Sequence, residues 1–184
     1  MPVRTVIERG PKGKRSVAFV IDWPGWSRGA RSAELALETL ESYRERYRPV
    51  AGSAGMARQF DGAGQLEVVE DRVGTGSTDF WGISFSPSAT EHGPMGEPEL
   101  ERAITLLRGC WAFFDGVAAR VSPEMRKGPR GGGRDRDRII RHTVRTEKRG
   151  LREASRIAGT GGRGAHPGRA AAASGGLRRG DARV

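Results

Sequence analysis

The sequence predicts an α+β fold: a small antiparallel β-β-α-β-β sheet domain followed by a two-helix partial bundle and a disordered tail. Three observations predict it. β-rich runs flank one helical run near the N-terminus, two longer runs repeat apolar residues every three or four positions, and large apolar residues almost vanish after Ile157. The expected division is a sheet domain at 1–88, a linker at 89–97, a helical part at 98–157 and a disordered tail at 158–184.

The first half of the sheet domain is predicted to be a β-hairpin and a helix. Residues 2–8 and 16–22 are β-rich, and the loop RGPKGKR between them has the Pro and Gly of a hairpin. Residues 32–47 place apolar residues on one face of a helix. Ser32 is the expected N-cap of this helix, and Pro49 is expected to end it.

The second half of the sheet domain is predicted to return to strands. One helical turn near Met56 leads to a strand at 66–72. The alternation of Trp81, Ile83 and Phe85 then predicts a last strand at 79–87, so that GTGSTD before it is interpreted as a β-hairpin connection rather than a phosphate loop.

The helical part is predicted to hold two long helices. Pro98 suits the first turn of one helix, and Asp135 is expected to cap the other, since GPRGGGRD before it is interpreted as an interhelix loop. The first helix is expected to dock on the sheet domain or to form a homodimer, because it carries a continuous apolar stripe. The members of this stripe, expected to be buried, are Leu100, Ile104, Leu107, Trp111, Phe114, Ala118 and Val121.

The charge of the chain is concentrated in its last third. Residues 1–125 hold 15 Lys and Arg against 17 Asp and Glu, whereas residues 126–158 hold 12 against 4, and the whole chain carries a formal charge of +10. After Ile157 the chain cannot bury enough apolar surface to offset the entropy of ordering, which predicts disorder from about Gly159 onward.

The chain is expected to be a soluble, cytoplasmic protein without a membrane partner. Cys110 is its one cysteine, which excludes a disulfide within the chain and fits a reducing compartment. The longest clean apolar run, residues 17–21, is far too short to span a bilayer, and the N-terminus lacks the apolar centre of a signal peptide.

Arginine and lysine residues of the second helical segment are candidate nucleic-acid contacts. Together with the other basic residues of 126–156 they are interpreted as a solvated face, not as one stripe, because acidic residues interrupt them. No aromatic residue occurs between 126 and 184 to stack on bases. Nucleic-acid binding is therefore an alternative that the sequence does not favour. The candidates are Arg134, Arg138, Arg141, Arg145, Lys148 and Arg149.

His142 is the single candidate metal ligand. A protein metal site needs about three converging ligands, and neither His92 nor His166 has a spacing that matches one. A lone histidine on a helix favours a polar flank residue, so we expect no bound cofactor and no metal-dependent activity.

Two pairs of aromatic residues are candidate protein-binding positions. Trp23 and Trp26 lie in the turn-rich DWPGW, where they either form a binding surface or cap the sheet–helix core. Trp111 and Phe114 lie on the aromatic stripe of the first long helix. No Ser/His/Asp set, HExxH or CxxC motif is present to indicate catalysis.

The N-terminal part resembles the HicB-type antitoxin domain. Asp22, Pro24 and Gly25 match its D-x-PG turn, and Glu34 and Leu35 match the helix that follows. The resemblance covers residues 1 to about 86. It implies a small α+β fold and a protein partner, such as an RNA-cleaving toxin.

The following part, residues 99–147, is similar to the first two helices of DinB-like proteins. Those are metal-dependent four-helix bundles that include thiol transferases, and by position His142 matches their first metal ligand. The H-x-x-x-H pair that completes their divalent-metal site has no match in this sequence. The Gly/Ala/Arg text after about residue 148 is typical of a frameshifted GC-rich gene, so we hypothesise a truncated or frameshifted member of a two-domain family.

Three functional hypotheses follow from the sequence. The first is a HicB-like/DinB-like fusion that lacks metal-dependent activity as written, although intact relatives would hold a divalent metal. The second is an antitoxin-type protein-binding module that acts through the sheet domain. The third is a basic nucleic-acid-binding protein that uses residues 126–156.

Overall fold

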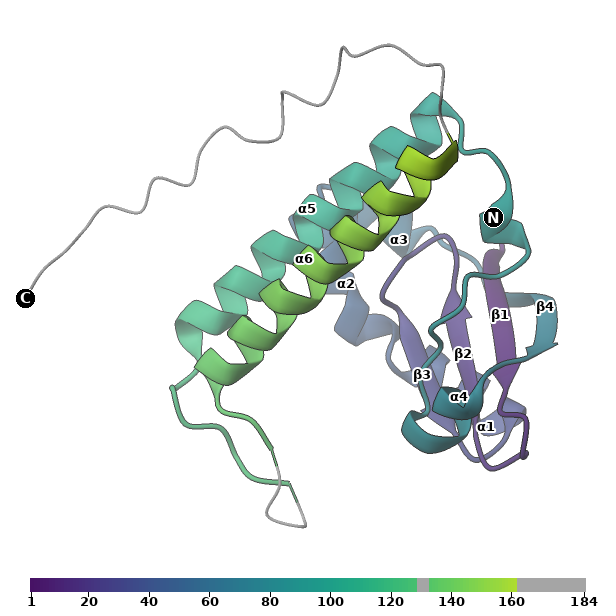
Figure 1. Ribbon diagram of the computed structural model, residues 1–184, viewed down its shortest axis with the longest axis horizontal. Coiled ribbons are helices and arrows are strands. Elements are labelled where there is room, and N and C mark those ends of the chain that lie inside the picture. Colours follow the sequence, from purple (N-terminus) through teal and green to yellow (C-terminus); the bar gives the residue numbers. More distant parts are fainter. Residues whose placement is uncertain (129–132, 162–184) are drawn as a thin grey trace, which may run out of the picture. The chain divides into compact units, whose positions relative to one another are not determined.

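The computed structural model describes residues 1–128 and 133–161, with side chains up to residue 150 (Figure 1). The chain divides into two compact units, Met1–Arg120 and Val121–Val184. The division lies at the end of a long helix, and the linker expected at 89–97 stays a prediction. The α+β class is confirmed, and several of its elements differ from the prediction.

The first unit holds a four-stranded mixed sheet in the order β3-β2-β1-β4. β1 (Val3–Arg9), β2 (Ser16–Val20) and β3 (Ser27–Ala30) pair as antiparallel neighbours, but β4 (Leu66–Val73) runs parallel to β1. The prediction of an antiparallel sheet is therefore wrong. Three helices lie between β3 and β4, and such a crossover is the connection that parallel pairing requires. β3 was missed because it has only four residues inside a turn-rich stretch.

The helix expected at 32–47 is two helices, α1 (Ala33–Ser42) and α2 (Arg44–Ser53). Ser32 is confirmed as the N-cap, since its hydroxyl accepts a hydrogen bond from the Leu35 N–H at 3.3 Å. Pro49 does not end the helix but lies inside α2. Proline removes only one helical donor, and the burial of α2 side chains on both sides of it holds the helix together.

The tryptophans of DWPGW lie in the core. Trp23 and Trp26 are almost fully buried, and their rings contact Tyr47 and Phe60 with centroids 4.9 to 6.3 Å apart. The Trp26 indole N–H donates to the Leu40 carbonyl at 2.8 Å. These two side chains therefore complete the sheet–helix core and do not form a binding surface. Phe60 belongs to α3 (Ala57–Asp61), the helical turn expected near Met56.

The strand expected at 79–87 is absent, because the chain forms helix α4 (Gly76–Trp81) and then an irregular stretch. Thr75 caps this helix by accepting from the Ser77 N–H at 3.3 Å, and Gly82 ends it in the left-handed region with φ 67°. GTGSTD is thus the start of a helix, not a hairpin connection. The alternating pattern predicted a strand wrongly, because the aromatic side chains here are exposed and do not form the buried face of a strand.

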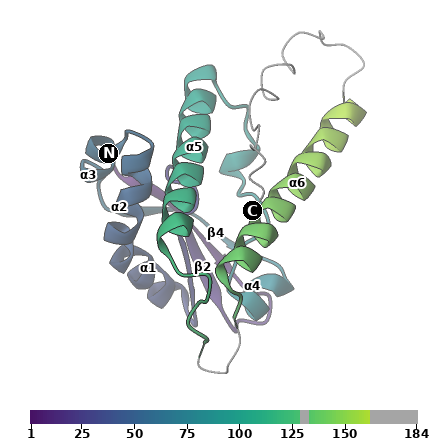
Figure 2. The same ribbon diagram turned by 90° about the vertical axis from the view of Figure 1, so that its left-hand side faces the viewer.

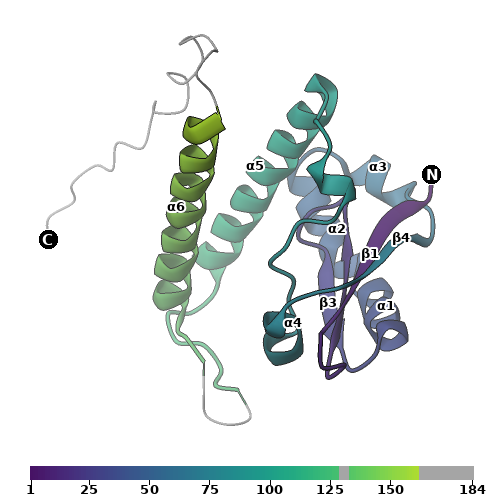
Figure 3. The ribbon, with the colours of Figure 1, turned by 45° about the vertical axis from the view of Figure 1, so that its right-hand side comes forward.

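The two faces of the sheet have different covers. α1 packs on one face, where its Ala36 and Leu40 join Val3, Ala18 and Val20 in the core. α4 lies on the opposite face, as Figures 2 and 3 show. The stretch that carries α4, residues 74–92, is called the cover segment below.

A bulge in β4 decides which of its side chains lie under the cover segment. The pairing of β4 with β1 shifts by one residue between Val68 and Glu70, which leaves Val69 as the extra residue. Because side chains alternate along a strand, this shift turns Glu70 and Arg72 to the face that carries Glu8. Glu8 and Arg72 become directly opposed residues of neighbouring strands.

Helix α5 (Glu97–Arg120) follows the short 3-10 helix η1 (Thr90–His92) and packs on α2. Docking on the sheet domain is thus confirmed, but the predicted stripe is not the face that docks. Leu106 and Gly109 are the buried positions. Gly109 lies so close to Ala54 that an added Cβ would be 2.6 Å from the Ala54 Cβ. The predicted residues Leu100, Ile104, Leu107 and Trp111 remain 39% to 49% exposed.

The described part of the second unit contains helix α6 (Arg136–Gly161). Asp135 stands at its start, as predicted, and its carbonyl accepts the first helical hydrogen bond from the Ile139 N–H at 3.0 Å. The helix continues beyond its expected end at Ile157. The rest of the predicted tail lies outside the described residues.

Of the helices in residues 1–128 and 133–161, none combines the length and the hydropathy needed to cross a bilayer.

Candidate nucleic-acid interface

Five exposed cationic side chains of α6 lie on one side of the helix. Successive residues of an α-helix are rotated by about 100°, so these five fall within an arc of roughly 100°. They extend over about 16 Å along the axis at 1.5 Å per residue. We call them the basic stripe: Arg138, Arg141, Arg145, Lys148 and Arg149.

The interpretation that the basic residues do not form one stripe concerned the whole set, whereas these five share one side of the helix. It counted Arg134, which precedes the helix, and Arg136, which projects to the opposite side. Arg136 pairs with Asp137 at 2.8 Å, and Asp135 pairs with Lys127 at 3.5 Å. The acidic residues at the start of the helix are therefore paired outside the stripe.

The stripe itself carries uncompensated charge. Within the described residues no ion pair joins any of its five side chains to a carboxylate. Glu147 lies on the other side of α6, about 160° away from Arg145 around the axis. The apolar residues Ile139, Ile140 and Val144 occupy that other side as well. The helix is therefore amphipathic, with one cationic and one apolar side.

His142 is exposed on α6 beside the basic stripe. Its carbonyl accepts from the Thr146 hydroxyl at 2.9 Å, which is an ordinary contact within a helix. In the part of the chain that the structure describes, no three His, Cys, Asp or Glu residues gather as a metal site would need. Among the described residues, His142 therefore belongs to no cluster of three candidate ligands.

The predicted protein-binding positions on α5 do not belong to the same unit as the basic stripe. Trp111 is partly exposed and Phe114 half-buried on α5 in the first unit, whereas the stripe belongs to the second.

A groove of about 780 Å³ also lies in the first unit, between α1, α3 and β4. Its arginine, Arg44, is engaged by the Glu41 carboxylate at 2.5 Å and by the Gly64 carbonyl at 2.9 Å. The groove therefore offers no unoccupied cation to a ligand.

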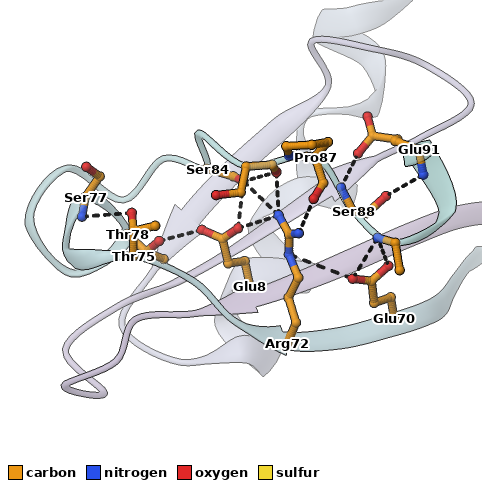
Figure 4. A network of polar contacts seen from close by, with 12 residues as sticks. Glu8, Glu70, Arg72, Thr75, Ser77, Thr78, Ser84, Pro87, Ser88 and Glu91 are labelled. Atoms are coloured by element: carbon orange, nitrogen blue, oxygen red, sulfur yellow. Dashed lines mark hydrogen bonds and ion pairs between the residues drawn. The ribbon is translucent and has the colours of Figure 1, made fainter. Parts of the chain in front are cut away.

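The cover segment of the first unit is fixed by a buried ion pair (Figure 4). Glu8 is fully buried and accepts from the Arg72 guanidinium at 2.6 Å. Its carboxylate also accepts from the hydroxyls of Thr78 at 2.5 Å and Ser84 at 2.8 Å, both in the cover segment. A buried carboxylate is stable only when it is paired and hydrogen-bonded, and these contacts meet that condition.

Arg72 extends the same network to the end of the cover segment. Its guanidinium donates to the Ser86 carbonyl at 2.5 Å and to the Pro87 carbonyl. Glu70, which lies 3.9 Å from the Arg72 Nε, accepts from the Ala89 N–H at 2.9 Å. The irregular stretch after α4 is thereby held to two strands by side chains (Figure 4).

A second anchor joins the cover segment to the β1–β2 hairpin. The Asp79 carboxylate accepts from the backbone N–H groups of Lys12 at 2.7 Å, Lys14 at 2.8 Å and Arg15 at 3.3 Å. Desolvation alone would raise the pKa of Asp79, but these three donors outweigh it and hold that pKa below its ordinary value. A side chain at Gly10 would displace this carboxylate, because an added Cβ would lie 2.1 Å from an Asp79 oxygen.

The Asp79 anchor brings exposed aromatic rings beside exposed cations. Phe80 and Trp81 follow Asp79 directly, are 70% and 64% exposed, and contact each other edge to face at 4.5 Å. Arg15 reaches to within 3.3 Å of the position that a Gly82 Cβ would take. We call this group the basic–aromatic surface: Lys12, Lys14, Arg15, Phe80 and Trp81.

No family model, curated protein or solved structure matches this chain. The resemblances to HicB-like and DinB-like domains therefore stay predictions.

Several residues of these surfaces were missed from the sequence. Glu8 gave no specific signal, because the strand VRTVIER also holds Arg4, Thr5 and Arg9, and its distant partner Arg72 could not be identified. The sequence did predict a hairpin loop at GPKGKR, which contains the three cations. Their proximity to Trp81 could not be predicted, because the Asp79 contacts join residues more than 60 positions apart.

Proposed function

We propose that this chain is a nucleic-acid-binding protein that contacts the phosphate backbone through the basic stripe of α6. The observation that carries the proposal is the alignment of five exposed cations, unpaired within the described residues, along one side of one helix. A polyanion with closely spaced charges is the partner that such a stripe fits best, because neutralising phosphates releases condensed counterions.

The length and charge of the stripe support a duplex partner. The stripe covers about 16 Å, and duplex DNA carries one negative charge per about 1.7 Å of its axis. Several phosphates therefore lie within reach of the five side chains. Described acidic residues at the start of α6 are held in other pairs, so they do not compete for these cations.

Substitution of the stripe tests the proposal. We expect the variant Arg138→Gln/Arg141→Gln/Arg145→Gln to bind a short labelled DNA or RNA duplex roughly 100-fold more weakly at low salt. Each phosphate contact of the wild type releases about 0.9 counterion from the duplex, and the variant loses this favourable release at three positions. Fluorescence anisotropy measures the affinity. Glutamine keeps the helix propensity, so circular dichroism should remain unchanged.

A charge-matched control separates the stripe from net charge. Arg31→Gln/Arg58→Gln/Arg108→Gln also removes three exposed cations, all in the first unit. This control should bind the duplex within a few-fold of the wild type. Equal losses in both variants would mean that only overall charge matters, and no loss in the stripe variant would refute the proposal.

The proposal takes up the third hypothesis from the sequence. A HicB-like/DinB-like fusion, truncated or frameshifted, remains compatible with it, because Arg138, Arg141 and Arg145 all precede residue 148, where the sequence changes character. The antitoxin-type hypothesis loses Trp23 and Trp26 as contact residues, since both are buried.

A further inference from the structure

We propose that the basic–aromatic surface of the first unit is a second nucleic-acid site, which takes single strands by stacking bases on Trp81 and Phe80. This inference extends the proposed function to a second surface. Its evidence comes from the first unit alone and does not depend on α6.

The surface combines the two features that single-strand binding requires. Successive bases stack on exposed aromatic rings while cations hold the backbone. Phe80 and Trp81 expose most of their surface, and their edge-to-face contact leaves ring faces open. In a duplex the base faces are covered by their neighbours, so stacking on Trp81 selects an unpaired strand.

The cations of the hairpin are available to phosphates. Lys12, Lys14 and Arg15 are exposed, and none of their side chains has a hydrogen bond or ion pair among the described residues. Asp79 occupies their backbone N–H groups. An anion at this surface must therefore be held by the side chains, whose reach suits a backbone that runs past the rings.

The surface is also preorganised. Asp79 fixes the hairpin to α4, and the Glu8–Arg72 pair fixes the stretch that follows α4 to the sheet. The carbonyl oxygen of Gly82 lies 2.4 Å from where a Gly29 Cβ would stand, so the end of α4 rests directly on β3. Rings held in this way lose little entropy when a base stacks on them.

The charge of the hairpin and the open ring faces favour a nucleic acid over an apolar protein surface. Three cations belong to the hairpin that Asp79 holds to the helix carrying the two aromatic rings, and this combination favours an anionic partner with flat apolar groups. An acidic protein would satisfy the cations but would not require stacking. The experiment therefore includes an acidic polypeptide as a competing probe.

Tryptophan fluorescence of the full chain tests the inference. We expect an oligothymidine strand to quench the emission of exposed Trp81, and Trp81→Ala to abolish that quenching and to weaken binding roughly 5- to 150-fold. Trp111→Phe is the control, because Trp111 lies on α5 outside the surface. It should retain the quenching. Lys12→Gln/Lys14→Gln should make the slope of log K against log salt shallower by about 0.7 for each phosphate contact that is lost.

Three outcomes would overturn the inference. Quenching that persists in Trp81→Ala would place the strand elsewhere. In the Arg138→Gln/Arg141→Gln/Arg145→Gln chain, binding of poly-glutamate as tight as that of oligothymidine would identify an acidic protein as the partner class. In the same chain, an affinity for a duplex equal to that for the single strand would exclude stacking. Repeating the titration in the Arg138→Gln/Arg141→Gln/Arg145→Gln chain keeps the two sites distinguishable, since quenching should survive there even if the stripe binds nothing.

Discussion

Glu8 and Arg72 form the buried pair on which the position of the cover segment depends. Glu8 is fully buried, and Arg72 joins it to carbonyls at the end of the segment. A buried ion pair adds little net stability compared with apolar residues, but the loss of one partner leaves an uncompensated charge. The pair therefore acts mainly to specify where the cover segment lies.

Arg72→Met should destabilise the first unit by about 3–5 kcal/mol, because the Glu8 carboxylate would remain buried without its cation. Urea unfolding followed by circular dichroism measures the change in the free energy of unfolding. The double variant Glu8→Gln/Arg72→Met should recover part of this loss. A single variant as stable as the wild type would show that the pair does not hold the segment.

Asp79 is the residue that links the aromatic rings to the hairpin, and its ionisation should make that link depend on pH. The three backbone donors lower the pKa of Asp79 in the folded state relative to its ordinary value of 3.8. A depressed pKa contributes stability above the unfolded pKa, and this contribution is lost as the pH falls through the folded pKa. The affected range therefore lies below about pH 4.

Asp79→Asn should lower the melting temperature at neutral pH, and the difference from the wild type should shrink as the pH falls below about 4. Thermal melts at a series of pH values measure this. Asp115→Asn, which changes an exposed carboxylate on α5, should have little effect at any pH. A difference between Asp79→Asn and the wild type that stays constant with pH would contradict the role of the carboxylate charge.

At the scale of elements, the docking of α5 depends on a close helix contact. Gly109 faces Ala54 with no room for a side chain, whereas Gly116 on the same helix has nothing within 4 Å of its Cβ position. This contact explains why the more apolar side of α5 is not the docked one. The aromatic side chains there are too large for so close an approach.

Gly109→Ala should destabilise the first unit by about 1–3 kcal/mol, because the added methyl group forces α5 away from α2. Gly116→Ala is the matched control and should be neutral or stabilising by about 0.5–1 kcal/mol, since alanine favours a helix interior over glycine. Chemical denaturation of both variants measures the contrast. Equal stability of the two would refute the close-contact account of the docking.

Helix α6 shows how the angular positions of residues around a helix axis change a functional interpretation. Counted over 126–156, the basic residues occupy most of the polar side. With the helix start at Arg136, which agrees with the predicted Asp135 cap, those from Arg138 to Arg149 fall on one stripe. Arg136, which pairs with Asp137, projects away from this stripe, and this makes a phosphate-backbone contact of the stripe a specific hypothesis.

At the scale of the whole molecule, the two units carry different cationic surfaces. The first unit is close to neutral overall but presents a short basic hairpin beside aromatic rings, and the second holds most of the net positive charge of the chain. Because the two surfaces differ in chemistry, we expect the affinity of the stripe to depend mainly on the charge density of the nucleic acid. We expect the affinity of the basic–aromatic surface to depend on unpaired bases.

Local features of the fold were predictable from the sequence, and distant pairings were not. The first two strands, the strand at 66–72, the Ser32 cap and the two long helices follow from periodicity and capping. The parallel pairing of β4 and the bulge at Val69 depend on contacts between distant segments, as does the choice of the Gly109 face of α5. The helix at Gly76–Trp81 was missed because alternation of exposed aromatics imitates a strand.

The salt dependence of duplex binding is the measurement that tests the central claim most directly. If all five cations of the basic stripe contact phosphates, log K should fall with log salt at a slope of about −4.5, which is roughly a 500-fold loss between 50 and 200 mM salt. Arg138→Gln/Arg141→Gln/Arg145→Gln should reduce the slope to about −1.8. A wild-type slope near zero, or a variant slope equal to that of the wild type, would contradict the account.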